Sequence, residues 1–299
     1  MIKNIIQSII LLSIICGCIP KRLSERKVAS GPYKIVVGAD PQLFMRQKND
    51  LFWQQTIDLV ISLNPDFFIV CGDLTNAGNK ASRWEDPVRA ASYEKQAAAY
   101  LSGSKRLEKH LPVYNVAGNH DVTLRPTPER LAWYENKFGK AWYSFEHRNS
   151  LFIVLESNLL RDPSGAPQKA KEQKEWFKKL LQKSKHKNYD HKFAFMHHPM
   201  CLKSVSEKSG YYNMPEKIRN ELLDLFHDNN FTAVFSGHLH KNNYMRVGKL
   251  ELITTGSCCV PLGKDPKGVR IVEISKEHIQ HKYYNLEQKP ILDKPIQKK

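Results

Sequence analysis

The stretch VVGADPQLF, from Val36 to Phe44, is a short apolar run that ends abruptly on a carboxylate. The residues up to Ala39 have the composition of a buried β-strand. Asp40 follows at once, and Gln42 stands two residues later, beyond a proline. A carboxylate and an amide at the end of a buried strand indicate that this end of the strand belongs to a binding site.

Four other apolar segments with strand composition are followed in the same way by residues that carry ligand atoms. They are Phe67–Cys71 before Gly72-Asp73, Val113–Ala117 before Gly118-Asn119-His120-Asp121, Lys192–Met196 before His197-His198-Pro199, and Ala233–Ser236 before Gly237-His238-Leu239-His240. Parallel strands of one sheet place their C-terminal ends at one edge, where the sites of α/β proteins form. We therefore expect these groups to converge, although they are up to about 200 residues apart.

The order of the expected elements bears on the fold class. Helical patterns cover Asp50–Leu63, Ala90–Leu111, Glu129–Phe138, Lys169–Ser184 and Glu216–Asn229, with Thr127-Pro128 as a helix start. The first strand is expected over Tyr33–Ala39, and further strands at Leu151–Glu156, Leu250–Thr254, Val269–Ile274 and His278–Tyr284. The order is βαβαβ early and rich in strands late. This order favours two facing sheets flanked by helices over a single doubly wound sheet.

The residues at the strand ends offer more ligand atoms than one metal ion requires. They are Asp40, Gln42, Asp73, Asn119, His197, His238 and His240. Mixed carboxylate, amide and imidazole donors suit Zn, Fe or Mn. A carboxylate such as Asp73 can bridge two ions, and two ions ~3.5–4 Å apart can clamp a phosphate. His120 is not needed as a ligand and is free to protonate a leaving alkoxide.

Each motif alone also has an ordinary interpretation. Gly-Asp after a strand is common, His-x-His is often two surface histidines, and Asn119-His120-Asp121 can be a simple turn. His198 fits a structural or supporting role better than that of a ligand. The joint occurrence of the motifs at successive strand ends is hard to produce by packing alone, and it predicts a site for two metal ions. The glycines before Asp73, Asn119 and His238 are expected to let the backbone turn tightly.

These motifs, read as GAD-P-Q, GD, GNHD, HHP and GHLH in this order, resemble those of the calcineurin-like metallophosphoesterases, over about residues 31–286. A closer resemblance is to the calcineurin-like phosphoesterase domain-containing protein 1 group. It rests on Asp40-Pro41-Gln42, on Leu262-Gly263-Lys264-Asp265 with Gly268-Val269-Arg270, and on His281-Lys282-Tyr283-Tyr284. The resemblance implies an α/β (α+β) fold, a four-layer αββα sandwich of two mixed β-sheets flanked by helices. It also implies phosphoester hydrolysis, and some members of the close group act on phosphoserine or phosphothreonine in proteins.

The family pattern also implies residue roles. It assigns one divalent ion to Asp40, Gln42, Asp73 and His240, and the other to Asp73, Asn119, His197 and His238, with metal identities among Mn, Fe, Zn and Mg. Asp73 and His120 are the implied catalytic residues, His120 as the acid, and Asn119, His120 and Arg83 the implied substrate-binding residues. Arg83-Trp84 resembles a short motif of the close group, although a surface arginine is the alternative.

Gln42 stands where most of the superfamily has histidine. An amide oxygen is a weaker and harder donor than an imidazole nitrogen, so the first ion is expected to bind more loosely, or to be Mn, Mg or Fe rather than Zn.

The N-terminus predicts an envelope lipoprotein. Lys3 precedes an apolar run, Ile5 to Ile15, that is too short to span a membrane, and Gly17-Cys18 resembles a lipobox. Residues 1–17 are thus expected to be a lipoprotein signal peptide, Cys18 the lipidated residue and 18–30 a tether. The phosphoesterase domain is expected at 31–288 and a tail at 289–299. The protein would be held to the membrane of a bacterial cell envelope by its lipid. An ordinary signal peptide is the alternative.

Composition sets wider limits. The chain has 299 residues, a formal net charge of +16 and 41% hydrophobic residues, enough for a substantial core. The lysines from Lys169 to Lys185 indicate a solvated helix face, and no nucleic-acid motif is visible, so no nucleic-acid partner is expected. Cys71, Cys201, Cys258 and Cys259 show no zinc pattern, and Cys71 has the setting of a packed apolar residue.

The leading interpretation is a phosphomonoesterase with two divalent ions, acting on a phosphoester substrate. The alternatives are a phosphodiesterase on cyclic nucleotides or glycerophosphodiesters, and a non-catalytic envelope protein that binds phosphate or a partner. His120 argues against the non-catalytic alternative, because binding alone has no need of an acid.

Overall fold

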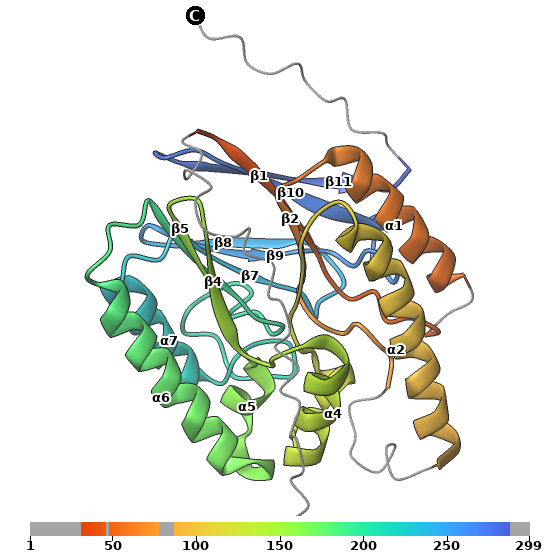
Figure 1. The fold of residues 1–299 in the computed structure, drawn as a ribbon. Coiled ribbons are helices and arrows are strands. Elements are labelled where there is room, and N and C mark those ends of the chain that lie inside the picture. The colour runs from red at the N-terminus through yellow and green to blue at the C-terminus, as the bar shows by residue number, and fades with distance from the viewer. Residues whose placement is uncertain (1–30, 46–47, 78–86, 288–299) are drawn as a thin grey trace, which may run out of the picture. The chain divides into compact units, whose positions relative to one another are not determined.

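Two mixed β-sheets organise the part of the chain that the computed structural model describes, residues 31–45, 48–77 and 87–287 (Figure 1). In the five-stranded sheet the order is β11 (Ile279–Asn285), β10 (Gly268–Ile274), β1 (Tyr33–Gly38), β2 (Phe67–Val70) and β3 (Val113–Asn115). In the six-stranded sheet it is β4 (Tyr143–His147), β5 (Ser150–Val154), β6 (His191–Phe195), β7 (Ala233–Ser236), β9 (Leu250–Thr254) and β8 (Asn243–Val247). In each sheet the parallel strands lie together. The antiparallel pairs lie toward the β11 edge of the five-stranded sheet and at both edges of the six-stranded sheet.

Helices cover the outer faces of both sheets. They are α1 (Asn49–Leu63), α2 (Pro87–Glu108), α3 (Asn119–Val122), α4 (Pro128–Phe138), α5 (Ser157–Arg161), α6 (Pro167–Ser184) and α7 (Glu216–Asp228), with a short 3-10 turn at Pro163–Gly165. Figure 1 shows α1 and α2 beside the five-stranded sheet and α6 and α7 on the opposite side of the molecule.

The alternation of side chains along the strands builds the layers. Successive residues of a strand point to opposite faces, so Val36 and Val37 belong to different cores. Val36 packs in a cluster with Trp53 of α1, whereas Val37 packs between the sheets in a cluster with Phe235 of β7. A third cluster joins the outer face of the six-stranded sheet to α6 and α7. The result is the four-layer αββα sandwich that the sequence predicts, and the fold class is confirmed.

Helix boundaries follow the expected signals closely. The Thr127 hydroxyl accepts a hydrogen bond from the Arg130 amide, and Pro128 is the first residue of α4, as predicted. In the layer outside the five-stranded sheet, the indole of Trp53 donates to the Tyr100 carbonyl at 3.2 Å and stacks on the Tyr100 ring with centroids 4.8 Å apart. This contact fixes α1 against α2.

Three expectations need correction. The ligand-bearing strands do not share one sheet, because β1, β2 and β3 lie in one sheet and β6 and β7 in the other. The edge strands β4 and β8 were not predicted, because their half-exposed, polar sequences lack the apolar pattern of a central strand. The strand expected to reach Glu156 ends at Val154, because the Glu156 carboxylate caps α5 by accepting the amides of Asn158 and Leu159.

Several predictions fall outside the described residues. They are the signal peptide 1–17, Cys18, the tether 18–30, Arg83 and the tail 289–299. A search of the described helices finds none with the length and apolarity needed to cross a membrane. The four cysteines in the described ranges are buried and free, and Cys71 packs between the sheets with its thiol pKa raised by burial.

Asp66 ties the two sheets together at the edge where β2 begins. Its carboxylate accepts the amide of Lys34 at 3.2 Å, the imidazole of His147 at 2.9 Å and the guanidinium of Arg148 at 3.2 Å. His147 and Arg148 belong to the β4–β5 hairpin of the other sheet. Burial alone would raise the pKa of Asp66, but these hydrogen bonds outweigh it and lower the pKa to about 2.

We expect Asp66→Asn to destabilise the protein by ~1 kcal/mol at neutral pH, a figure reduced for partial exposure. Because the folded pKa lies below the usual value, the stabilisation is complete above about pH 4 and is lost as the pH falls toward 2. Urea unfolding of both proteins between pH 7 and pH 2 measures the difference. Asp224→Asn, at an exposed position on α7, is the control. A difference that does not shrink at low pH would contradict the role of the Asp66 charge.

Candidate metal centre

The predicted ligands lie on tight turns that leave the strands. Five of them have positive backbone φ angles, between 37° and 70°: Asp40, Gln42, Asp73, His238 and His240. Residues with a Cβ rarely adopt this conformation, and each instance costs ~1–3 kcal/mol unless the surroundings impose it. Here the turns are held by one another, since the Asp40 amide donates to the Gly72 carbonyl and the Gln42 amide to the Asp73 carbonyl. Strain of this kind is found at functional sites, and no pattern in the sequence indicates it.

The glycines of the motifs act in a different way from the one expected. Only Gly72 has a positive φ, of 87°. Gly118 and Gly237 are required by close packing, because a Cβ at Gly118 would overlap the Asp73 backbone, and one at Gly237 would lie 2.9 Å from the Asp40 carboxylate. Gly118 therefore lets the turns after β2 and β3 of one sheet approach each other, and Gly237 lets the turn after β7 approach the turn after β1 of the other sheet.

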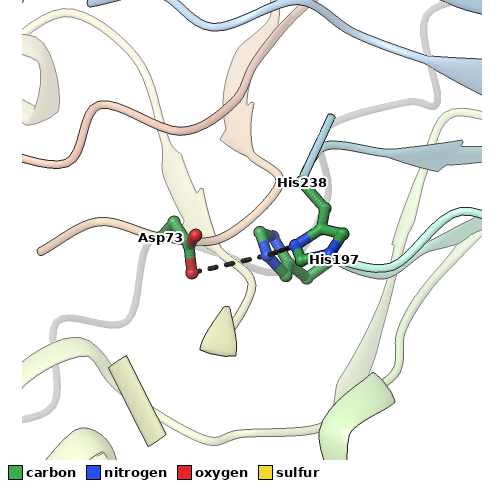
Figure 2. Close-up of side chains that lie close together, drawn as sticks. All are labelled: Asp73, His197 and His238. Carbon is green, nitrogen blue, oxygen red and sulfur yellow. Dashed lines mark hydrogen bonds and ion pairs between the residues drawn. The ribbon is translucent and has the colours of Figure 1, made fainter. Parts of the chain in front are cut away.

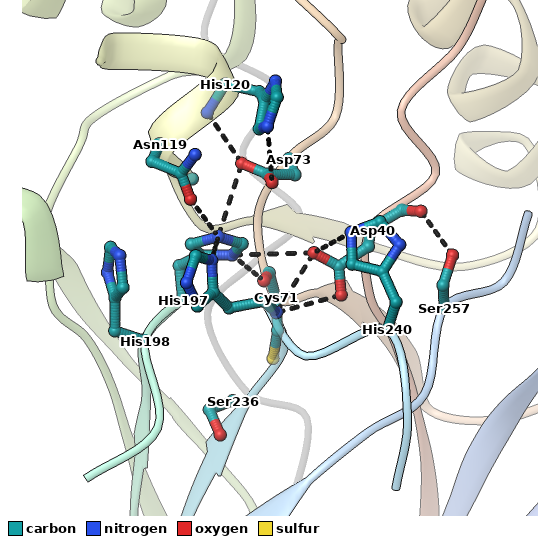
Figure 3. Close-up of polar contacts among 12 residues, drawn as sticks. Asp40, Cys71, Asp73, Asn119, His120, His197, His198, Ser236, His240 and Ser257 are labelled. Atoms are coloured by element: carbon teal, nitrogen blue, oxygen red, sulfur yellow. Dashed lines mark hydrogen bonds and ion pairs between the residues drawn. The ribbon is translucent and has the colours of Figure 1, made fainter. Parts of the chain in front are cut away.

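Two buried carboxylates form the centre of the site. Asp40 and Asp73 have almost no exposed surface. Among the described residues, two three-residue groups have ligand atoms that all lie within 4.8 Å of one another: Asp73 with His197 and His238, and Asp40 with Asp73 and His240. Asp73 belongs to both groups. Figure 2 shows Asp73 facing the two histidines of the first group, and Figure 3 shows Asp40 and His240 near Asp73 and His197.

The three histidines are oriented by backbone carbonyls. His197 Nδ1 lies 2.9 Å from the Cys71 carbonyl, His238 Nε2 lies 3.1 Å from the Tyr211 carbonyl, and His240 Nδ1 is hydrogen-bonded to the Val260 carbonyl. In each ring the other nitrogen is left for the cluster. His197 Nε2 lies 3.4 Å from Asp73 Oδ1, and His240 Nε2 lies 3.8 Å from Asp40 Oδ1. A carbonyl on one ring nitrogen is the usual support of a metal-binding histidine.

The two amide side chains complete the donor set. The Asn119 Oδ1 lies 3.0 Å from His197 Nε2. Gln42 Nε2 donates to Asp73 Oδ2 at 3.0 Å, while Gln42 Oε1 is buried without a hydrogen-bond partner. A buried orphan acceptor is costly, and a bound cation would satisfy it. These residues therefore fit divalent metal ions.

The charges of the cluster are strongly coupled. Burial raises the pKa of Asp40 to about 6. Burial acts in the same direction on Asp73, but the positive charge of nearby histidines outweighs it and holds the pKa of Asp73 well below its usual range. Burial lowers the pKa of His197, yet Asp73 raises it further, to about 9, while burial and the charge of His197 lower the pKa of His238 to about 3. A bound cation would take the place of the protons that this cluster holds.

His120 is the most accessible group of the site. Its backbone amide donates to Asp73 Oδ1 at 2.8 Å, and its Nε2 lies 4.0 Å from Asp73 Oδ2. Its side chain is 17% exposed, whereas the Asp73 side chain is 1% exposed. The imidazole therefore lies beside the shared carboxylate and within reach of solvent, as a group that transfers a proton must (Figure 3).

Sequence reasoning missed two supporting residues. Asp121 is buried and accepts the amides of Gly118, Leu74 and Thr75, so it joins the turn of Asp73 to that of Asn119. Burial and the charge of Asp73 raise the pKa of Asp121 to about 7. The Ser257 hydroxyl donates to the Asp40 carbonyl at 2.6 Å. The GNHD motif contains Asp121, so the sequence could have indicated it. No sequence motif indicates Ser257, which lies on a loop 217 residues after Asp40.

His198 has the supporting place expected for it. Its Nδ1 lies 2.9 Å from the Ser157 hydroxyl, and its ring packs 4.4 Å from that of His238. Burial lowers the pKa of His198 well below its usual value, so the ring is neutral.

Comparison with known proteins matches residues 33–242 to the calcineurin-like phosphoesterase family, more than half of the chain. This chain belongs to the calcineurin-like phosphoesterase family. The serine/threonine-protein phosphatase CPPED1 of Rattus norvegicus is 30% identical over 276 residues, which cover 87% of this chain and 86% of the relative. The resemblance to this group and to its superfamily is thus confirmed, and the protein is a metallophosphoesterase, a hydrolase of phosphoric esters.

Two solved structures share the fold of this chain. GAP50, the anchor in the inner membrane complex of Plasmodium, superposes with a TM-score of 0.61 at 16% identity and covers 88% of this chain and 87% of its own. A dimetal phosphatase from Danio rerio gives a TM-score of 0.58 at 12% identity and covers 85% of this chain and 99% of its own. At these identities the likeness concerns the fold alone.

Substitutions of Gln42 test whether its side chain is a metal ligand. If its amide oxygen binds an ion, Gln42→His should lower the apparent activation constant for Zn and leave that for Mg unchanged or higher, because imidazole is the softer donor. One good ligand gained corresponds to ~1.4 kcal/mol, or tenfold in affinity. Gln42→Ala should weaken the binding of one metal ion and leave the binding of the other largely unchanged. Metal titrations with activity as readout compare the three proteins, and identical titrations for every ion would exclude Gln42 as a ligand.

Proposed function

We propose that this metallophosphoesterase is a phosphomonoesterase with a dinuclear metal centre. The observation that carries the proposal is Asp73, which belongs to both groups of buried ligand atoms. The relative of Rattus norvegicus, named a serine/threonine-protein phosphatase, supports a monoester substrate. A carboxylate shared between two clusters of this composition is suited to bridge two divalent ions.

Each ion has a set of candidate ligands. Asp40, Gln42, Asp73 and His240 would hold one ion, and Asp73, Asn119, His197 and His238 would hold the other. When bound, the two ions would withdraw electron density from the phosphoryl oxygens and supply a nucleophile from water at neutral pH. Mn, Fe, Zn and Mg all suit these donors, with the amide of Gln42 favouring the harder ions.

The side chains of the protein orient the ester and move the proton. Asn119 is the first residue of α3, and its Oδ1 lies beside His197. Its amide nitrogen is buried without a partner and would contact a phosphoryl oxygen. As the bond from water oxygen to phosphorus forms and the ester P–O bond breaks, the leaving oxygen needs a proton. His120 would give it, and the exposure of its ring beside Asp73 supports this role.

The shared carboxylate gives the decisive test of the metal centre. We expect the purified protein to hold close to two divalent ions per chain after reconstitution, and Asp73→Asn to lose most of both. Elemental analysis after gel filtration measures the content. Glu129→Gln, at a carboxylate on the first turn of α4, is a control that should keep both ions. A single tightly held ion that survives Asp73→Asn would contradict the dinuclear centre.

The function of His120 depends on the leaving group. We expect His120→Ala to lower kcat by about 10²–10⁴ on alkyl phosphomonoesters, where the leaving oxygen needs protonation. The loss on p-nitrophenyl phosphate should be far smaller, because its leaving group is stable as an anion. His110→Ala, at an exposed position after α2, is the control. Equal losses on both substrates would instead indicate that His120 binds phosphate or orients Asp73.

The same assay separates the two kinds of ester. Chromogenic monoesters and diesters are compared at matched concentration with each of Mn, Fe, Zn and Mg. Faster hydrolysis of the diesters would overturn the monoester proposal while leaving the family assignment unaffected.

A further inference from the structure

Two neighbouring tyrosines are exposed beside the candidate metal centre. Tyr211 and Tyr212 lie on the loop between β6 and α7 and are 41% and 52% exposed. Their ring centroids lie 4.8 Å and 5.9 Å from that of His238. The two rings are 5.0 Å apart and nearly perpendicular, at 86°. They form an aromatic corner next to a predicted metal ligand, and we call this pair the tyrosine corner.

The loop that carries the tyrosine corner is braced on both sides. Arg161 of α5 donates to the carbonyls of Gly210 and Asn213, the residues that flank the pair. The Asn213 side chain accepts the Gly210 amide at 2.7 Å and donates to the carbonyl of Lys208 at 3.0 Å. The two exposed rings are therefore presented by a loop with a defined backbone. Binding groups on loops need such a rigid support.

A second set of contacts fixes the ends of the loop. The Glu207 carboxylate accepts the amides of Leu202 and Lys203, each at 2.8 Å. The Met214 amide donates to the carbonyl of Pro199, which follows His198. The C-terminal end of the loop is thereby joined to the turn that carries His197, and Glu207 holds the preceding part of the loop.

Core packing does not account for the two rings, which lie against the His238 imidazole but belong to none of the three large core clusters. His238 is oriented by the backbone carbonyl of Tyr211, which any residue would supply at that position. Both side chains keep two-fifths or more of their surface in solvent, so they contribute little to the core. A single exposed aromatic residue is ordinary, but an exposed pair on a braced loop beside a catalytic cluster marks a contact surface.

We propose that the tyrosine corner binds a planar ring carried by the alcohol part of the phosphomonoester. The inference rests on the proposed function and adds a class of substrate to it. A planar ring can stack on one tyrosine and meet the other edge to face, both of which are favoured aromatic geometries. The ring can come from a phenol-like alcohol esterified directly to phosphate, or from the base of a nucleotide.

Two matched pairs of compounds test this substrate class on the metal-loaded full-length protein. Phenylphosphonate and cyclohexylphosphonate carry the same charge and similar bulk but differ in planarity, and calorimetry measures their affinities without any reaction. Adenosine 5′-monophosphate and ribose 5-phosphate share the same primary ester and differ in the base, and kcat/KM compares them. We expect the planar member of at least one pair to be favoured by about tenfold or more, as single-ring stacking gives.

Leucine variants connect the preference to the two rings. Tyr212→Leu and the double variant Tyr211→Leu/Tyr212→Leu keep apolar bulk but remove the flat face, and we expect the preference to fall to about twofold or less. Tyr244→Leu is the matched control, because Tyr244 is 51% exposed on β8 and is given no part in binding. Its planar preference should equal that of the wild type. Melting temperatures of all variants confirm that each is folded.

The outcomes separate the substrate class from the proposed function. A preference only in the phosphonate pair supports an aryl ester, and one only in the ester pair supports a nucleotide. Equal behaviour within both pairs, or a preference that survives the double variant, would overturn the inference. Hydrolysis of ribose 5-phosphate by the wild type tests the phosphomonoesterase activity independently, because this ester has no planar ring. If no monoester is hydrolysed, the phosphonate affinities still decide whether the tyrosine corner recognises planarity.

Discussion

The arrangement of the site depends on one buried carboxylate, that of Asp73. It has 1% of its surface exposed, so its charge must be met by protein groups or by a bound cation. The partners come from separate turns: the Gln42 amide, the His120 backbone amide and the His197 ring. The turns after β1, β2, β3 and β6 thus converge on a single acid, and a second acid, Asp40, lies beside it (Figure 3). The turns pack closely because their polar groups must compensate the charge of these two buried carboxylates.

The sandwich architecture makes such a convergence possible. Three of the contributing strands belong to one sheet and two to the other, so the site lies where the C-terminal ends of both sets of parallel strands meet. The aromatic core between the sheets, with Phe152, Phe195 and Phe235, holds the sheets at a fixed separation. Gly237 then allows the turn after β7 to approach the turns after β1 and β2 of the other sheet. Positive φ angles at five ligands are the conformational cost of bringing these side chains to one point.

The buried ligand cluster and the loops around it, here called the rim, have different parts in the function. The interior contains the donor set, the oriented histidines and the shared acid, and these features are compatible with several ions and with more than one kind of phosphoric ester. The rim is formed by loops, among them the segment that Arg161 braces and that ends in α7. Specificity among esters is decided by what the alcohol part contacts, which is a property of the rim.

The sequence by itself determined the chemistry of the site and the class of fold. Carboxylate, amide and imidazole side chains directly after short apolar strands are local features, and their donor properties do not depend on the rest of the chain. The start of α4 could be predicted for the same reason. Thr127 caps the helix and Pro128 begins it, and both effects are confined to its first turn. The half-polar edge strands β4 and β8 were not readable, since their stability comes from pairing with β5 and β9 rather than from their own composition.

Only the tertiary structure decided the rest of the site. It divided the ligand-bearing strands between two sheets and decided which ring nitrogen of each histidine faces the cluster. It also brought the Ser257 hydroxyl to the Asp40 carbonyl and the tyrosine corner against the His238 ring. Each of these depends on contacts between residues far apart in the chain, 126 positions for His197 and Cys71 and 217 for Ser257 and Asp40. No local pattern encodes such contacts, because they are selected by the packing of whole layers against one another.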